Sequence, residues 1–345
     1  MIDREKDILI ITSQKFNSTK LLISHKTNLI ISSIEYNKDT KSITVTPDST
    51  SIISFPDDIL SIHHLSSINK ILISCVSNKS LYLLEEKIIY ENKKFLAEFN
   101  PEKDGLIFQN NKKMTAILDI KENEEKYFLI ISDKFGEISL KPIKKEESKE
   151  SFEKEIKIVT GHCDTIVYLK KSINDKLLLS SDNFGKIKIY DFPNIFNVIS
   201  VILYHENEIN YVNFGGKEDK CIFVINKDGN IDLWSTYDFI MKNKIKMDFL
   251  INGEKILEVK CLNKNEILMM KTDKKIILLK INDEKYEINM IKEIEKEKNK
   301  DNNNGDKENK IEERLEDKFF DYEGNTHHLL LNTDDHTIQK INLII

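Results

Sequence analysis

Residues 177–192 read LLLSSDNFGKIKIYDF: an apolar run, a polar turn with glycine, and a run in which Lys and Ile alternate. Alternation with a period of two residues is typical of a β-strand with one buried face. Two other segments share this layout, FLIISDKFGEISLKPI at 128–143 and IFVINKDGNIDLWSTY at 222–237. We interpret the three segments as copies of one strand–turn–strand unit.

The spacing of the turn glycines gives the length of the repeat. Gly136, Gly185 and Gly229 follow one another at intervals of 49 and 44 residues. Upstream of the second and third copies stand Gly161-His162 and Tyr204-His205, each followed by a further apolar run. A unit of about 40–45 residues with a Gly-His start and a Trp-Asp-like end is typical of a WD-repeat propeller blade.

Shorter apolar runs, bounded by Asn, Asp, Lys or Gly, indicate further blades at 8–50, 57–97 and 245–283 and a last strand pair at 326–345. We therefore expect an all-β fold, a seven-bladed WD-repeat β-propeller that forms one domain over 1–345. Strands from both chain ends would close the last blade, which removes free sheet edges. Two charged tracts, 144–157 between blades and 284–318, are expected to be solvated or disordered insertions.

The composition excludes several classes of function. The 345 residues include 52 Lys and Arg against 58 Asp and Glu, a net charge of -6, which argues against a protein that coats nucleic acid by bulk charge. The N-terminus is charged, and no stretch approaches the roughly 18 apolar residues of a membrane span. We expect a soluble intracellular protein that does not bind membranes.

The sequence has no recognisable catalytic or metal motif. No CxxC pair occurs, so a zinc site or redox pair is not indicated; the four cysteines are Cys75, Cys163, Cys221 and Cys261. The adjacent histidines of His63-His64 and His327-His328 would point to opposite faces of a strand, so neither pair predicts a metal site. Neither GxGxxG nor GxxxxGK[ST] is present. We expect a non-enzyme that holds no cofactor.

In WD-repeat proteins, which this pattern resembles, the Gly-His histidine is held by a turn Asp and a strand hydroxyl. That resemblance implies structural roles for four residues: His162, His205, Asp228 and Trp234. In blades three and four the turn-Asp position is occupied by Phe135 and Phe184. We expect incomplete networks in these two blades, with ring packing in place of the missing hydrogen bonds.

A more specific resemblance is carried by ISDKFGE at 131–137 and LSSDNFGKIKI at 179–189, followed by DFPNIFNV at 191–198. These segments resemble the WD-repeat, non-catalytic subunit of the tRNA (guanine-N7-)-methyltransferase. In that family blade three has an ADK-x-GD turn, and blade four has a [SA]DRDE-x-I-[KR]-[VI] strand. The match spans about 128–240. It departs from the family at 183–185, where Asn, Phe and Gly replace Arg, Asp and Glu.

The resemblance implies an accessory subunit that binds and stabilises the methyltransferase catalytic subunit as a heterodimer. The partner would use S-adenosylmethionine to form N7-methylguanosine in the tRNA variable loop. The partner contacts implied by the family pattern are Asp182, Lys186, Lys188, Asp133 and Lys134. A nuclear location is implied as well, with the cytoplasm as a second possibility, and direct contact with tRNA stays open.

Alternative interpretations of these residues and of the whole chain remain open. Asp182 could simply cap its own turn, and Lys186 and Lys188 could form a solvated strand face. The whole chain could be a WD-repeat scaffold in another assembly, such as one for ribosome biogenesis or trafficking. An enzyme would require a polar cluster in the central channel, which the sequence does not predict.

Overall fold

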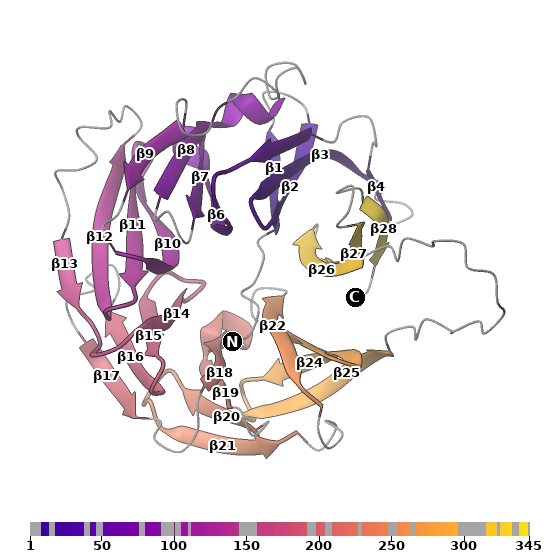
Figure 1. Ribbon diagram of the computed structural model, residues 1–345. Helices are drawn as coiled ribbons and strands as arrows, with labels where there is room; N and C mark the ends of the chain where they lie inside the picture. Colours follow the sequence, from indigo (N-terminus) through magenta and orange to yellow (C-terminus); the bar gives the residue numbers. More distant parts are fainter. Residues whose placement is uncertain are drawn as a thin grey trace, which may run out of the picture.

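The described part of the chain consists of short antiparallel strands joined by turns. It comprises, in this computed structural model, residues 8–13, 18–37, 42–45, 51–75, 80–90, 100, 105–109, 112–144, 157–191, 198–203, 209–226, 230–247, 254–262, 266–295, 315–322, 325–332 and 338–343. The strands form seven sheets, which follow one another around a ring (Figure 1). The expected all-β, seven-bladed WD-repeat β-propeller is confirmed.

The first four sheets contain the turns at 131–137 and 179–189 that carry the family resemblance. Blade one contains β1 (Ile8–Ser13), β2 (Ser18–His25), β3 (Asn28–Asn37), β4 (Ser42–Val45) and β5 (Ser51–Ser54). Blade two contains β6 (Ile59–Leu65), β7 (Lys70–Cys75), β8 (Ser80–Glu85) and β9 (Leu106–Gln109), with short 3₁₀ helices η2 (Ser66–Ile68) and η3 (Glu86–Tyr90). Blade three contains β10 (Met114–Asn123), β11 (Lys126–Asp133), β12 (Glu137–Lys144) and β13 (Lys157–Thr160). Blade four contains β14 (Ile166–Lys171), β15 (Leu177–Asp182), β16 (Lys186–Asp191) and β17 (Val198–Leu203).

The last three sheets complete the ring. Blade five contains β18 (Ile209–Gly215), β19 (Cys221–Asn226), β20 (Asn230–Ser235) and β21 (Met241–Lys246), with the 3₁₀ helix η5 (Lys217–Asp219). Blade six contains β22 (Ile256–Leu262), β23 (Ile267–Thr272), β24 (Lys275–Asn282) and β25 (Glu287–Glu295). Blade seven contains β26 (Leu315–Tyr322), β27 (Asn325–Asn332) and β28 (Ile338–Leu343).

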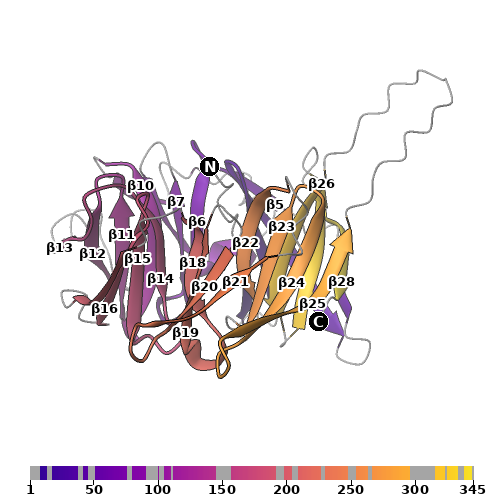
Figure 2. The same cartoon turned by 90° about the horizontal axis from the view of Figure 1, so that it is seen from below.

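Each blade starts at the centre of the ring and moves outward strand by strand. The first strands β6, β10, β14, β18 and β22 contact one another in that order and lie nearest the axis (Figure 1). In the view turned by 90°, most strands run between the two ends of a short cylinder (Figure 2). The described turns between a second and a third strand, at 26–27, 134–136, 183–185 and 273–274, therefore lie at the same end of the propeller.

Apolar side chains fill the space between neighbouring blades. In β16, Ile187 and Ile189 are fully buried and pack with Phe214 and Val224 of blade five. Lys186 and Lys188 alternate with them and are only partly buried. Burying an Ile or Leu side chain contributes about 1.5–3 kcal/mol to the stability of the fold. Burial of the two isoleucines therefore decides which face of β16 is turned toward blade five.

The charged tracts differ from the prediction in extent. Residues 145–156 lie outside the described residues, and the strands on either side, β12 and β13, belong to one blade. The first tract is therefore inside blade three and not between blades. In the second tract, Glu287–Glu295 is β25, the outer strand of blade six. A bulge at Ile291 interrupts its alternation, and this break, among so many charges, concealed the strand pattern.

The ends of the ring also differ from expectation. Within the described residues, every strand of the blade-seven sheet comes from the C-terminal part of the chain, and no described N-terminal strand joins it. Strand β4 pairs with β3 of blade one and contacts β28 of blade seven. Blade six begins at β22 and not at 245, because residues 241–246 form the outer strand of blade five.

Candidate functional site

In four consecutive blades the second strand ends on a polar side chain that holds the following turn. The four residues are Asp133, Asp182, Asn226 and Thr272. Each side-chain oxygen accepts hydrogen bonds from backbone N–H groups beyond the turn. Short polar side chains stabilise turns in this way. The reading of Asp182 as the cap of its own turn thus matches the geometry.

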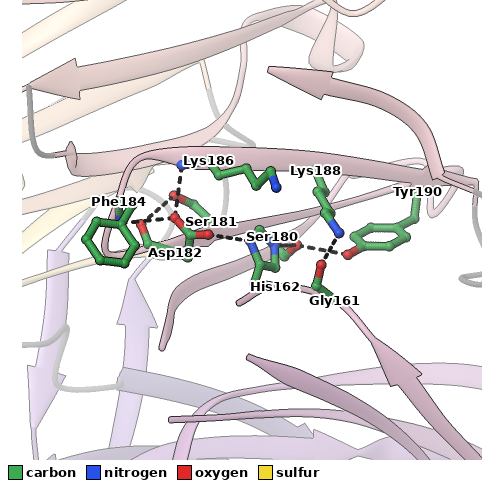
Figure 3. A network of polar contacts seen from close by, with 9 residues as sticks. All are labelled: Gly161, His162, Ser180, Ser181, Asp182, Phe184, Lys186, Lys188 and Tyr190. Carbon is green, nitrogen blue, oxygen red and sulfur yellow. Dashed lines mark hydrogen bonds and ion pairs between the residues drawn. The ribbon is translucent and has the colours of Figure 1, made fainter. Parts of the chain in front are cut away.

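Asp182 is also the centre of a polar network in blade four (Figure 3). Its Oδ1 accepts hydrogen bonds from the backbone N–H groups of Phe184 (3.0 Å) and Lys186 (2.9 Å). Its Oδ2 lies 2.8 Å from Nδ1 of His162, whose side chain is fully buried. The carboxylate is thereby occupied on both oxygens and buried, which places it inside the blade and away from any partner.

The network continues from His162 into the sheet. His162 Nε2 lies 2.6 Å from Ser180 Oγ, which donates to the Tyr190 hydroxyl at 3.3 Å. Four side chains from one loop and two strands are therefore linked in series (Figure 3). The structural role expected for His162 agrees with this geometry. The expectation that blade four has an incomplete network is wrong, because Asp182 supplies the carboxylate two residues before the expected position.

The network perturbs the acidity of its carboxyl group. Burial alone would raise the pKa of Asp182, but the hydrogen bond from His162 and those from the backbone of Lys186 and Phe184 outweigh it and hold the pKa below its usual range. Hydrogen bonds to the charged form stabilise it in this manner. Asp182 is therefore a stable carboxylate and not a proton donor at neutral pH.

The two lysines of β16 have different positions. Nζ of Lys188 donates to the carbonyl oxygen of Gly161, in the loop before β14. Burial, followed by repulsion from Lys186, lowers the pKa of Lys188. Lys186 is partly exposed and uses only its backbone N–H in the network. Lys188 therefore makes an internal contact, whereas the Lys186 side chain is directed along the blade surface (Figure 3).

The aromatic rings of the two turns are mostly exposed. Phe184 is 77% exposed and Phe135 is 56% exposed. The expectation that these rings replace a missing hydrogen-bond network is therefore wrong. With the carboxylates of Asp133 and Asp182 holding the turns, the rings are free to project outward.

Blade three repeats the turn but not the network. Asp133 Oδ1 accepts hydrogen bonds from the N–H groups of Phe135 (2.8 Å) and Glu137 (3.1 Å). Its Oδ2 lies 3.7 Å from Nζ of Lys112, which also pairs with Glu137. Asp133 is buried, like Asp182, while Lys134 is exposed. Of the predicted blade-three contacts, only Lys134 is therefore accessible to a partner.

Blade five places the predicted structural residues only in part. His205 and Asp228 lie outside the described residues. Asn226 occupies the position of Asp182 in blade four and is fully buried. Trp234 occupies the position of Tyr190 and packs with Val224 and Phe214. Val224 stands where blade four has Ser180, so the serine hydroxyl link of blade four has no counterpart here.

The structure brings together a polar cluster that the sequence did not predict. His63 Nδ1 lies 2.8 Å from Asp119 Oδ1, and His63 Nε2 lies 2.9 Å from Ser61 Oγ. Burial would raise the pKa of Asp119, but the hydrogen bond from His63 outweighs it and the pKa is lowered. β6 and β10 are the inner strands of neighbouring blades, so this cluster joins blade two to blade three.

This Ser–His–Asp cluster links blade two to blade three through side-chain hydrogen bonds. The same three residue types form the buried network of blade four, where they join a loop to a strand. Ser61 is buried and its Oγ also lies 2.7 Å from Ser74 Oγ. A nucleophile must reach its substrate, and the described contacts hold this hydroxyl inside the sheet.

Among the described residues, no group of three or more His, Cys, Asp and Glu side chains is arranged to hold a metal ion. No helix in the same part of the chain is long and apolar enough to cross a membrane.

The fold and the capped turns define the class: this chain is a WD-repeat β-propeller protein. One solved structure with this arrangement is a chain from the crystal structure of the mitotic checkpoint complex, with a TM-score of 0.53 and 10% sequence identity. That likeness covers 85% of this chain and 83% of the other, and at such low identity it concerns the fold alone.

A curated protein gives a more particular similarity. The chain is 29% identical over 137 residues to the tRNA (guanine-N(7)-)-methyltransferase non-catalytic subunit wdr4 of Dictyostelium discoideum. The aligned part is 36% of this chain and 29% of that protein, so the chain matches less than a third of the relative's length. No protein-family model matches the sequence.

Proposed function

We propose that this protein is the non-catalytic subunit of a tRNA guanine-N7 methyltransferase. The observation that carries the proposal is the 29% identity to a non-catalytic subunit of that enzyme. In this role the chain binds and stabilises the catalytic subunit, which holds the methyl donor and transfers the methyl group to guanine. The resemblance of the turns at 131–137 and 179–189 to the family motifs supports the same role.

The geometry of blades three and four suits a docking subunit. The turns at 133–137 and 182–186 are each fixed by a buried Asp, so a partner that binds there would not have to order them. Fixing a surface in advance lowers the entropic cost of association. Lys134 and Lys186 stand beside these turns with accessible side chains, and they are the lysines of the predicted set that we assign to the partner contact.

Co-expression tests the proposal. The tagged chain would be produced with each candidate methyltransferase of the same cell, and the purified complexes would be assayed for N7-methylguanosine in tRNA. We expect one candidate to co-purify in equimolar amounts and to lose activity when produced without this chain. A folded chain that recovers no methyltransferase, and instead a large multiprotein assembly, would contradict the proposal and favour a scaffold of another complex.

The cellular location is a further part of the proposal. A nuclear location is expected because the resemblance to the methyltransferase subunit implies it. Fluorescence microscopy of the tagged chain at its natural level would test this, and a signal confined to the cytoplasm would contradict it.

A further inference from the structure

Two exposed aromatic rings stand on neighbouring blades at the same end of the propeller. Phe184 follows Asp182 by two residues in blade four, and Phe135 follows Asp133 by two residues in blade three. Their exposed fractions are 77% and 56%. An apolar ring that stays exposed to water does not gain the free energy that burial would contribute to folding.

The two turns are joined into one unit by the loop at 161–165. The Thr165 hydroxyl donates to the carbonyl oxygen of Lys134 (2.8 Å), and the Thr165 carbonyl accepts from the N–H of Asn183 (3.1 Å). Each ring is therefore the immediate neighbour, along the chain, of a residue bound to Thr165. These hydrogen bonds hold the backbone of the two turns together through one residue.

Gly136 makes the close approach of loop and turn possible. Its carbonyl oxygen accepts from the N–H groups of Gly161 (3.2 Å) and His162 (2.9 Å). Its φ is +82°, and a Cβ at this position would lie 2.4 Å from the His162 carbonyl oxygen. Only glycine fits both the backbone conformation and the space, so the turn of blade three is locked against the loop of blade four.

The charges around the rings indicate the chemistry of a partner. The segments 112–113, 133–137, 161–165 and 182–188 together contain five Lys against four Asp and Glu, in a chain whose net charge is -6. Two of the acids, Asp133 and Asp182, are buried, whereas Lys113 and Lys134 are exposed. Nζ of Lys134 lies 4.8 Å from the centroid of the Phe135 ring. The surface beside the rings is thus locally basic.

We infer that Phe135 and Phe184 are paired anchors that insert into apolar pockets of a partner protein, with carboxylates of that partner facing the adjacent lysines. This inference rests on the proposed function: the partner protein that receives the two rings is the methyltransferase catalytic subunit. Aromatic side chains are enriched in the buried centres of interfaces, and two rings held at a fixed separation lose little freedom on binding. A single excess positive charge is too small for strong phosphate binding, which favours protein over nucleic acid.

Binding measurements with the purified catalytic subunit test the inference. They compare the unchanged chain with the Phe135→Ala, Phe184→Ala and double variants. Burial of a Phe side chain is worth about 1.5–3 kcal/mol, so we expect each change to weaken binding at least tenfold and both together about a hundredfold. The melting temperature should stay within about 1 °C of the unchanged chain, because both rings are mostly exposed and exposed side chains contribute little to stability. Tyr237→Ala is the matched control: Tyr237 is 94% exposed, in the turn between β20 and β21 at the opposite end of the propeller.

The outcomes separate the two proposals. If the unchanged chain does not bind the catalytic subunit, the proposed function is wrong. The assignment of the two anchors to that partner is then wrong as well. If it binds and the double variant binds equally well, only the anchors are wrong. If the double variant retains protein binding and loses binding of tRNA by the isolated chain, the rings serve nucleic acid and the inference is overturned.

The thiol of Cys163 provides an independent readout, since it is exposed within the loop at 161–165. Burial raises the pKa of Cys75 to about 12 and also raises that of Cys221, so these two buried thiols should react slowly. We expect the catalytic subunit to slow maleimide labelling at Cys163 at least tenfold, measured by mass spectrometry of the peptide. Unchanged labelling in the saturated complex would contradict docking at this surface.

Discussion

Blades three and four hold the same turn with the same residue type, but their carboxylates contact different side chains. In both blades Oδ1 of the Asp accepts two backbone N–H groups. In blade four Oδ2 meets buried His162, whereas in blade three it faces Lys112, whose side chain is 37% exposed. The comparison separates two functions of one carboxylate: it caps a turn in both blades and builds a network into the sheet in only one.

The rest of each blade agrees with this difference. Blade four continues from His162 through Ser180 to Tyr190. In blade three the positions of Ser180 and Tyr190 are held by Ile131 and Lys141, so no hydroxyl chain can form there. Blade three is tied to its neighbour through Gly136 and Thr165 instead. The shared outcome is a pair of fixed turns with exposed rings.

The largest expected effect comes from removing the two carboxylates in turn. Asp182→Ala leaves His162 and two backbone N–H groups without their acceptor in a buried site, and we expect a loss of about 3 kcal/mol in the free energy of unfolding. Asp133→Ala loses the turn cap and a long contact with the partly exposed Lys112, but no buried histidine is left without its acceptor, and we expect a loss of about 1 kcal/mol. Urea denaturation measures both, and equal losses would contradict the contrast between the blades.

A pH series sharpens the comparison. The folded pKa of Asp182 is below its usual range, so its carboxylate stabilises the fold above an unfolded pKa of about 3.9. That stabilisation is lost as the pH falls through about 4 toward the folded pKa. We expect the stability difference between the unchanged chain and Asp182→Asn to shrink between about pH 5 and pH 3. A difference that stays constant over this range would show that Asp182 does not titrate as described.

The smallest effect is expected at the cation of blade three. Lys112→Met removes an exposed ion pair with Glu137 and a longer contact with Asp133, so we expect a smaller loss in the free energy of unfolding than for Asp133→Ala. Because salt screens exposed charges, this loss should fall toward zero at 1 M NaCl. Denaturation at low and high salt measures it. A loss as large as that of Asp182→Ala, and unchanged by salt, would mean that Lys112 is as integral to blade three as His162 is to blade four.

Much of the fold could be predicted because the repeats have regular spacing and alternation. The copies at 128–143, 177–192 and 222–237 coincide with the second and third strands of blades three, four and five. Strand β25 could not be predicted, because its charges and its bulge at Ile291 hide the period. Alternation identifies a strand only where register is continuous.

The site was harder to predict than the fold. Its residue types were found, but the turn-Asp position of blade four was assigned to Phe184, two residues after Asp182, which carries the carboxylate of the network. Only the pairing of β15 with β16 shows that Asp182 ends its strand and faces His162. The link from His63 to Asp119 joins residues on different blades, and no local pattern in the sequence encodes it. Exposure of Phe135 and Phe184 likewise depends on neighbouring loops.

Hydrogen exchange of the complex tests the docking surface most directly. The chain would be compared alone and saturated with the purified methyltransferase catalytic subunit, with exchange followed by mass spectrometry of peptides. The account predicts new protection in the turns at 133–137 and 182–186 and in the loop at 161–165, with none in the turn between β20 and β21. Protection confined to the outer strands β17 and β21, with unchanged exchange at the three predicted segments, would contradict it.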